Sequence, residues 1–81
     1  MNILDRLSDI IQDVLDDDEL EITRNTTADD AEDWDSLAQI QIIDALEKEF
    51  HIKLSMAEIE QMNQAGHVGA TVDLIAQKLT A

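Results

Sequence analysis

The sequence predicts an all-α protein, a four-helix bundle with a long first loop and a short third helix. Apolar residues recur at intervals of three and four in several stretches, which is the spacing of one helix face. The chain has no proline and two glycines, so little interrupts these stretches. With one Trp, one Phe and no Tyr, the core must be built from aliphatic side chains and methionine.

The length of 81 residues predicts a single domain, residues 1–81. A chain of this size buries only about 60–65% of its unfolded surface, which leaves little room for both a core and an enclosed catalytic cleft. There is no cysteine, which excludes a disulfide framework, a thiolate metal site and a thiol nucleophile.

The net charge of −14 indicates which partners to expect. A surface this negative repels nucleic acid and anionic membranes and attracts basic patches on proteins. The alternative is that the acidity serves solubility alone. Because no apolar run is long enough to span a membrane and no signal peptide is visible, we expect a cytoplasmic protein without membrane insertion.

Residues 3–15 are predicted to form the first helix, which ends at the acidic run 16–19. Acidic side chains oppose the helix dipole at a C-terminus, so fraying is expected there. Residues 16–35 show no sustained period, with Leu20 and Ile22 as possible anchors to the core. A connection of about twenty residues is long for a compact domain. The acidity of this connection suggests calcium binding as an alternative. However, no register places a glycine at the sixth position of a loop, as an EF-hand requires.

The second helix is predicted to run to Phe50, with Trp34 anchoring the loop at its mouth. On a helical wheel one broad arc is apolar and is expected to face the core. That arc holds Ile40, Ile42, Ile43, Leu46 and Phe50. The opposite, exposed face is expected to hold Ala38, Gln41, Ala45 and Lys48. Leu37 lies at the edge of the arc, which favours a contact surface.

Further local signals place the remaining helices. Ser55 and Glu58 fit a capping box that opens the short third helix, and Gly66 suits a left-handed cap at its end. The fourth helix is expected to begin near Val68. His51 and His67 lack companion ligands and are expected to be surface or capping residues.

Ser36 stands just ahead of the second helical pattern, where an N-cap is preferred. One interpretation is that Ser36 caps the helix and does nothing more. However, Asp35-Ser36-Leu37, the helix after it and the segment up to residue 54 resemble the acyl carrier proteins. The resemblance covers residues 3–79 and is densest over 35–62.

The resemblance implies a function. In acyl carrier proteins the Ser of an Asp-Ser-Leu motif carries 4′-phosphopantetheine as a phosphodiester, which points to Ser36. A phosphopantetheinyl transferase would load it from coenzyme A with Mg²⁺, with Asp35 and Leu37 in its recognition surface. The arm would carry acyl intermediates as thioesters to enzymes of fatty-acid or related lipid or polyketide biosynthesis. Nothing in the sequence would activate Ser36, so we expect a carrier and no enzyme.

The second helix is also the expected recognition surface for partner enzymes with basic patches. Leu37 would supply an apolar contact, and Asp44 and Glu47 would pair with basic residues. The family commonly has acidic residues at Ala38 and Gln41 and an apolar one at Asp44, and Lys48 interrupts an acidic run. This face is therefore expected to be less negative and less apolar than usual, which favours a dedicated pathway as much as the general fatty-acid synthase.

Three alternatives remain open at this point. The first is an aminoacyl carrier of the D-alanyl type or a peptidyl carrier. The second is an unmodified acidic helical adaptor, and the third is a calcium-responsive helical protein. We expect the carrier to be a monomer.

Overall fold

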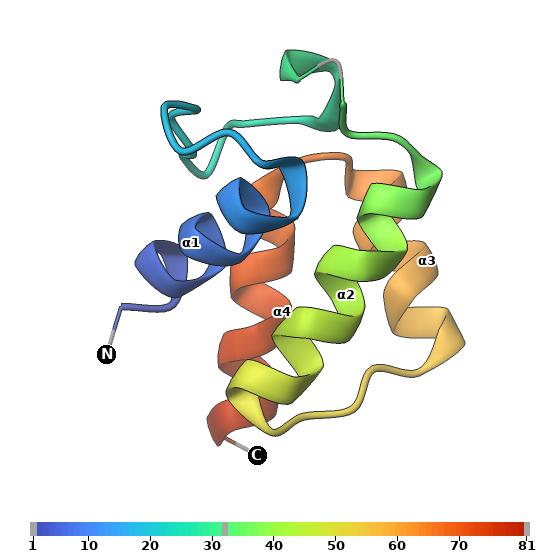
Figure 1. Ribbon diagram of the computed structural model, residues 1–81. Coiled ribbons are helices and arrows are strands. Elements are labelled where there is room, and N and C mark those ends of the chain that lie inside the picture. The colour runs from blue at the N-terminus through green and yellow to red at the C-terminus, as the bar shows by residue number, and fades with distance from the viewer. Residues whose placement is uncertain (1, 32, 81) are drawn as a thin grey trace.

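The computed structural model describes residues 2–31 and 33–80, which form four α-helices and no strand (Figure 1). In chain order these are α1 (Ile3–Leu15), α2 (Ser36–Phe50), α3 (Met56–Ala65) and α4 (Val68–Thr80). One short 3₁₀ helix, η1 (Ala28–Asp30), interrupts the long connection between α1 and α2. The predicted fold class is confirmed. No helix among the described residues has the length and apolarity to cross a lipid bilayer.

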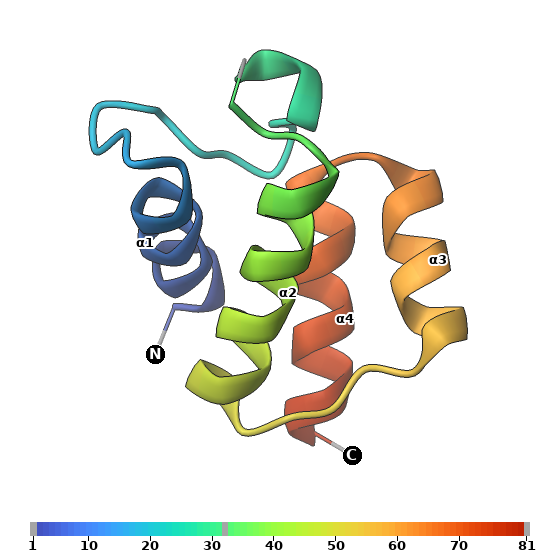
Figure 2. The same ribbon diagram turned by 45° about the vertical axis from the view of Figure 1, so that its right-hand side comes forward.

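Three helices share the core. α1 packs against α2 and α4, whereas α3 packs mainly against α4 (Figure 2). The four most deeply buried side chains are Leu7, Ile11, Leu46 and Ile75. They come from α1, α2 and α4, and each contributes about 1.5–3 kcal/mol through its removal from water.

The burial of α2 corrects two predictions. Ile40, expected in the core, is 63% exposed, and Ala38, expected on the wet face, is only 7% exposed. The buried positions are Ala38, Ile42, Ile43, Leu46 and Phe50. A helical wheel places the largest apolar side chains toward the core, but the packing of the other helices against α2 decides which face is buried. Ala38 joins the contiguous core cluster, whereas Ile40 is left largely exposed.

The long connection is attached to α4 through its backbone. The carbonyls of Arg24 and Thr26 accept the N–H groups of Gly69 and Val68 at 2.8 and 2.9 Å. A Cβ at Gly69 would lie 3.0 Å from the Arg24 carbonyl oxygen, so glycine permits this approach. Ile22 is buried, as predicted for a core anchor. These contacts satisfy the first N–H groups of α4 and fix the loop beside the start of α2.

The helix ends follow their local chemistry. Ser55 and Glu58 form the predicted capping box, and Gly66 adopts the predicted left-handed conformation with φ 75°. His67 Nδ1 accepts the N–H of Ala70 at 3.2 Å, which confirms a capping role. Where fraying of α1 was expected, Asp16 instead ends the helix in a left-handed cap with φ 54°.

Candidate functional site

The start of α2 is capped by Asp35 and not by Ser36. Asp35 has extended backbone angles, and its Oδ1 accepts the N–H of Ala38 at 2.9 Å. Aspartate and serine are equally good N-caps, so the residue type could not decide between them. The interpretation of Ser36 as the cap is therefore wrong. Ser36 is the first residue of the helix, and its exposed hydroxyl makes no hydrogen bond within the described part of the chain.

A cavity of about 540 Å³ opens beside Ser36, a size typical of small-molecule sites. It lies between α2 and α3 and reaches the core, because side chains of α1 and α4 also line it. Its inner wall is apolar and includes Leu7, Ile11, Ile43, Leu46, Ile59 and Met62. Its rim is polar and includes Thr27, Asp35, Ser36, Gln39 and Asn63.

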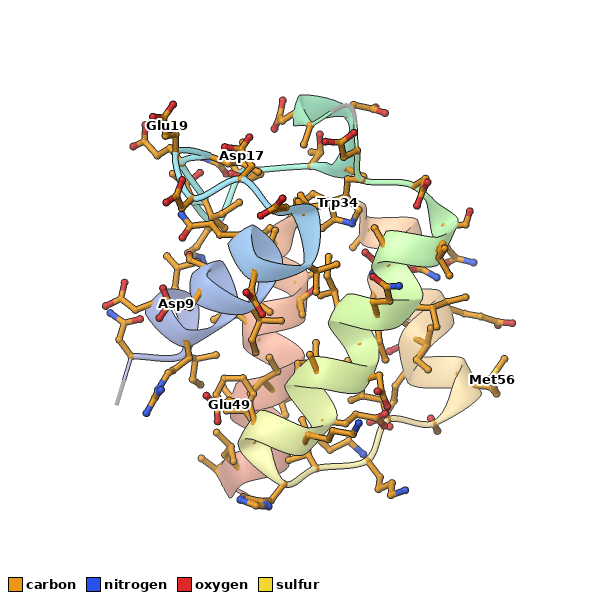
Figure 3. All side chains as sticks on the ribbon, in the orientation of Figure 1. Asp9, Asp17, Glu19, Trp34, Glu49 and Met56 are labelled. Atoms are coloured by element: carbon orange, nitrogen blue, oxygen red, sulfur yellow. The ribbon has the colours of Figure 1, made fainter. Side chains whose placement is uncertain are left out.

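A chain of hydrogen bonds crosses this rim. Trp34 Nε1–H donates to Gln39 Oε1 at 2.7 Å, and Gln39 Nε2–H donates to Asn63 Oδ1 at 3.3 Å. The three residues belong to the loop, α2 and α3, so the bridge ties these segments together. Trp34 is half-buried against the core at the end of the bundle where α2 begins, as predicted for a loop anchor (Figure 3).

Neither Gln39 nor Asn63 was predicted from the sequence as a site residue. One signal was available for Gln39, because residues three apart share a helix face and Gln39 follows Ser36 by three positions. Asn63 gave no such signal, because 24 residues separate it from Gln39.

Comparison with known proteins decides what this arrangement belongs to. Residues 5–75 match the family model described as a phosphopantetheine attachment site. The chain is also 38% identical to a holo acyl carrier protein from Geobacter metallireducens. The similarity covers 99% of this chain and 88% of that one, and the solution NMR structure of that protein superposes with a TM-score of 0.87. The chain belongs to the acyl carrier protein family.

An acyl carrier protein is a carrier and not an enzyme, and it bears covalently attached 4′-phosphopantetheine. It is a substrate of phosphopantetheinyl transferase and interacts with synthase enzymes. The residues of this chain fit the group. The exposed hydroxyl of Ser36 stands at a helix N-terminus, where the dipole favours an anion such as a phosphodiester. Asp35, whose charge would oppose that anion, has one carboxylate oxygen bound to the Ala38 N–H.

The outward face of α2 in this acyl carrier protein differs from the predicted recognition surface. Leu37, Gln41, Asp44 and Lys48 are exposed as required, but Ala38 is not. Ile40 takes its place beside Leu37, which is 64% exposed. The face is therefore more apolar than the sequence indicated.

The charges of this face also differ from the prediction. Lys48 Nζ lies 3.1 Å from Asp44 Oδ2, so the two exposed charges offset each other. Glu47 Oε2 accepts the N–H of Leu54 at 2.8 Å. Glu47 therefore holds the connection between α2 and α3 in addition to any role toward a partner.

Acidic side chains gather on the other side of the molecule. Figure 3 shows Asp9, Asp17 and Glu19 on α1 and the first loop, away from Met56 on α3. Within residues 2–31 and 33–80, no group of three or more His, Asp or Glu side chains is arranged to hold a metal ion.

Proposed function

We propose that Ser36 is the attachment residue for 4′-phosphopantetheine. The observation that carries the proposal is the capping of α2 by Asp35, which leaves the Ser36 hydroxyl exposed and available. When attached, the group supplies a thiol that binds acyl chains as thioesters. The protein's own contribution is to present this hydroxyl at the rim of an apolar cavity.

The cargo is an acyl chain of fatty-acid, related lipid or polyketide biosynthesis. The cavity beside Ser36 supports an acyl group over an amino acid, because its inner wall is built from aliphatic side chains and methionine. A chain that enters the cavity buries its carbons between α2 and α3 and is thereby protected from water.

The outward face of α2 supports an interaction with the enzymes of a dedicated pathway. Leu37 and Ile40 offer an apolar centre, and the Asp44–Lys48 pair offers almost no net charge. A partner with a strongly basic patch gains less here than on an acidic helix. We therefore assign docking to a partner surface with an apolar centre, with Asp35 and Leu37 in contact with the transferase.

The attachment residue is tested by intact mass. The protein is incubated with coenzyme A, Mg²⁺ and a broad-specificity phosphopantetheinyl transferase, and we expect a gain of one phosphopantetheine. The Ser36→Ala variant should gain nothing. Ser55→Ala is the matched control, because Ser55 also stands at a helix start but serves as its cap. A modified Ser36→Ala protein would contradict the assignment.

The cavity assignment has a separate test. Acetyl-, butyryl- and octanoyl-loaded protein should melt at progressively higher temperature, since each added carbon buries more apolar surface. A melting temperature independent of chain length would show that the chain stays in water.

A further inference from the structure

We propose that the Trp34–Gln39–Asn63 bridge makes this carrier selective for acyl chains with a hydroxyl group close to the thioester. The inference rests on the proposed attachment at Ser36 and concerns which chains the cavity accepts. Trp34 and Asn63 are the specificity-determining residues, and Gln39 is the group that the chain displaces.

The position of Gln39 places it in the path of the chain. Ser36, Gln39 and Ile43 follow one another on the face of α2 that lines the cavity. Gln39 is half-buried and held at both ends, by Trp34 at 2.7 Å and by Asn63 at 3.3 Å. A chain tethered at Ser36 that passes between α2 and α3 must cross this bridge and move the Gln39 amide aside.

Displacing Gln39 removes a hydrogen-bond partner from both Trp34 and Asn63, and the two losses differ in cost. The indole N–H of Trp34 is half-buried and loses its acceptor, which is unfavourable because a desolvated donor then has no partner. The side chain of Asn63 is exposed, so water can replace its partner. The selectivity therefore comes mainly from Trp34.

A hydroxyl group can replace the amide on both sides. It has one O–H donor and two acceptor lone pairs, whereas the displaced amide accepted from Trp34 and donated to Asn63. Beyond its thioester carbonyl, a saturated chain offers neither function. Below the rim the wall is apolar, so the rest of the preferred chain is hydrocarbon. We place the thioester outside the rim and the first carbons after it at rim depth, so the hydroxyl belongs near the thioester.

The sole tryptophan gives a direct readout, because its indole N–H produces one cross-peak in a ¹H–¹⁵N spectrum. Holo-protein is loaded with octanoyl or 3-hydroxyoctanoyl groups, and intact mass verifies loading. We expect the indole cross-peak to keep a hydrogen-bonded position with 3-hydroxyoctanoyl and to move upfield with octanoyl. The 3-hydroxyoctanoyl form should also melt about 4 °C higher, the shift expected for about one hydrogen bond in a domain of this size.

This order of melting temperatures is the reverse of what apolarity alone predicts, because octanoyl is the more apolar chain. Trp34→Phe should abolish the advantage of the hydroxylated chain. Gln39→Leu should raise the melting temperature of the octanoyl form relative to its own holo form, because no bridge has to be broken. Gln61→Leu, the same change at an exposed position of α3 outside the cavity wall, should keep the wild-type order.

The outcomes separate the two proposals. Failure to load Ser36 would overturn the attachment site. Successful loading with equal or greater stabilisation by octanoyl, and the same indole position in both forms, would overturn the selectivity while leaving the attachment intact.

Discussion

The helices α2 and α3 both line the cavity but are held in different ways. α2 buries five side chains, whereas α3 buries only Met62. Met62 also lies outside the contiguous core cluster and lines the cavity instead. α3 is secured mainly at its ends, by the Ser55–Glu58 capping box, by the left-handed cap at Gly66 and by the Glu58–Lys78 ion pair at 2.8 Å.

This difference shows how a small domain can hold its modification site firmly and still admit a chain. The start of α2 is fixed because the whole helix is part of the core. α3 can move away at a lower cost, because its one buried side chain, Met62, lies outside the contiguous core cluster. Local opening of α3 is therefore less costly than opening of the rest of the bundle.

The largest expected effect is a difference in stability between truncations in α2 and in α3. Leu46→Ala removes a fully buried side chain and should lower the free energy of unfolding by about 4 kcal/mol. Met62→Ala should lower it by about 2 kcal/mol, because Met62, unlike Leu46, lies outside the contiguous core cluster. Urea unfolding of both variants measures this contrast. Equal losses would mean that α3 belongs to the core as fully as α2.

A smaller effect concerns acid and the end of α3. The hydrogen bond with Lys78, followed by that with the Ser55 N–H, holds the pKa of Glu58 below its ordinary value. The ionised carboxylate therefore stabilises the fold above the ordinary pKa of about 4.3, and this contribution is lost as the pH falls through the lowered pKa.

Glu58→Gln should flatten the pH dependence of the α3 amide signals in that acidic range, as followed by NMR. Glu60→Gln, a neighbouring exposed carboxylate on the same helix, is the control and should behave as the wild type. Identical titrations for Glu58→Gln and the wild type would exclude the capping box as the acid-sensitive contact.

The smallest effect on stability is expected on the outward face of α2. Lys48→Gln breaks an exposed pair with Asp44 and should change the free energy of unfolding by less than about 0.5 kcal/mol. It leaves Asp44 uncompensated, so association with a basic phosphopantetheinyl transferase should become faster at low salt. Stopped-flow measurements at two ionic strengths test this, and an unchanged rate would place the pair outside the docking surface.

The parts of the fold that were predictable depend on neighbours in sequence. The bounds of α3 were predictable because capping is a local interaction. The signals were Ser55 and Glu58 at its start and Gly66 after its end. The orientation of α2 was not predictable, since the burial of Ala38 and the exposure of Ile40 depend on where α1, α3 and α4 lie.

The candidate site divides in the same way. Asp35-Ser36-Leu37 marked the position of the site, but two residues of equal capping ability stood side by side, and only the backbone at Asp35 distinguishes them. The bridge between Gln39 and Asn63 joins distant parts of the chain and required the fold itself.

The most direct test of the contrast between α2 and α3 is backbone hydrogen exchange in the holo-protein and in its 3-hydroxyoctanoyl form. We predict that amides in the middle of α3 exchange at least about tenfold faster than those in the middle of α2, through local opening. Loading should slow exchange in α3 and leave α2 nearly unchanged. If both helices exchanged through one common opening, and loading affected them equally, α3 would not be the movable wall of the cavity.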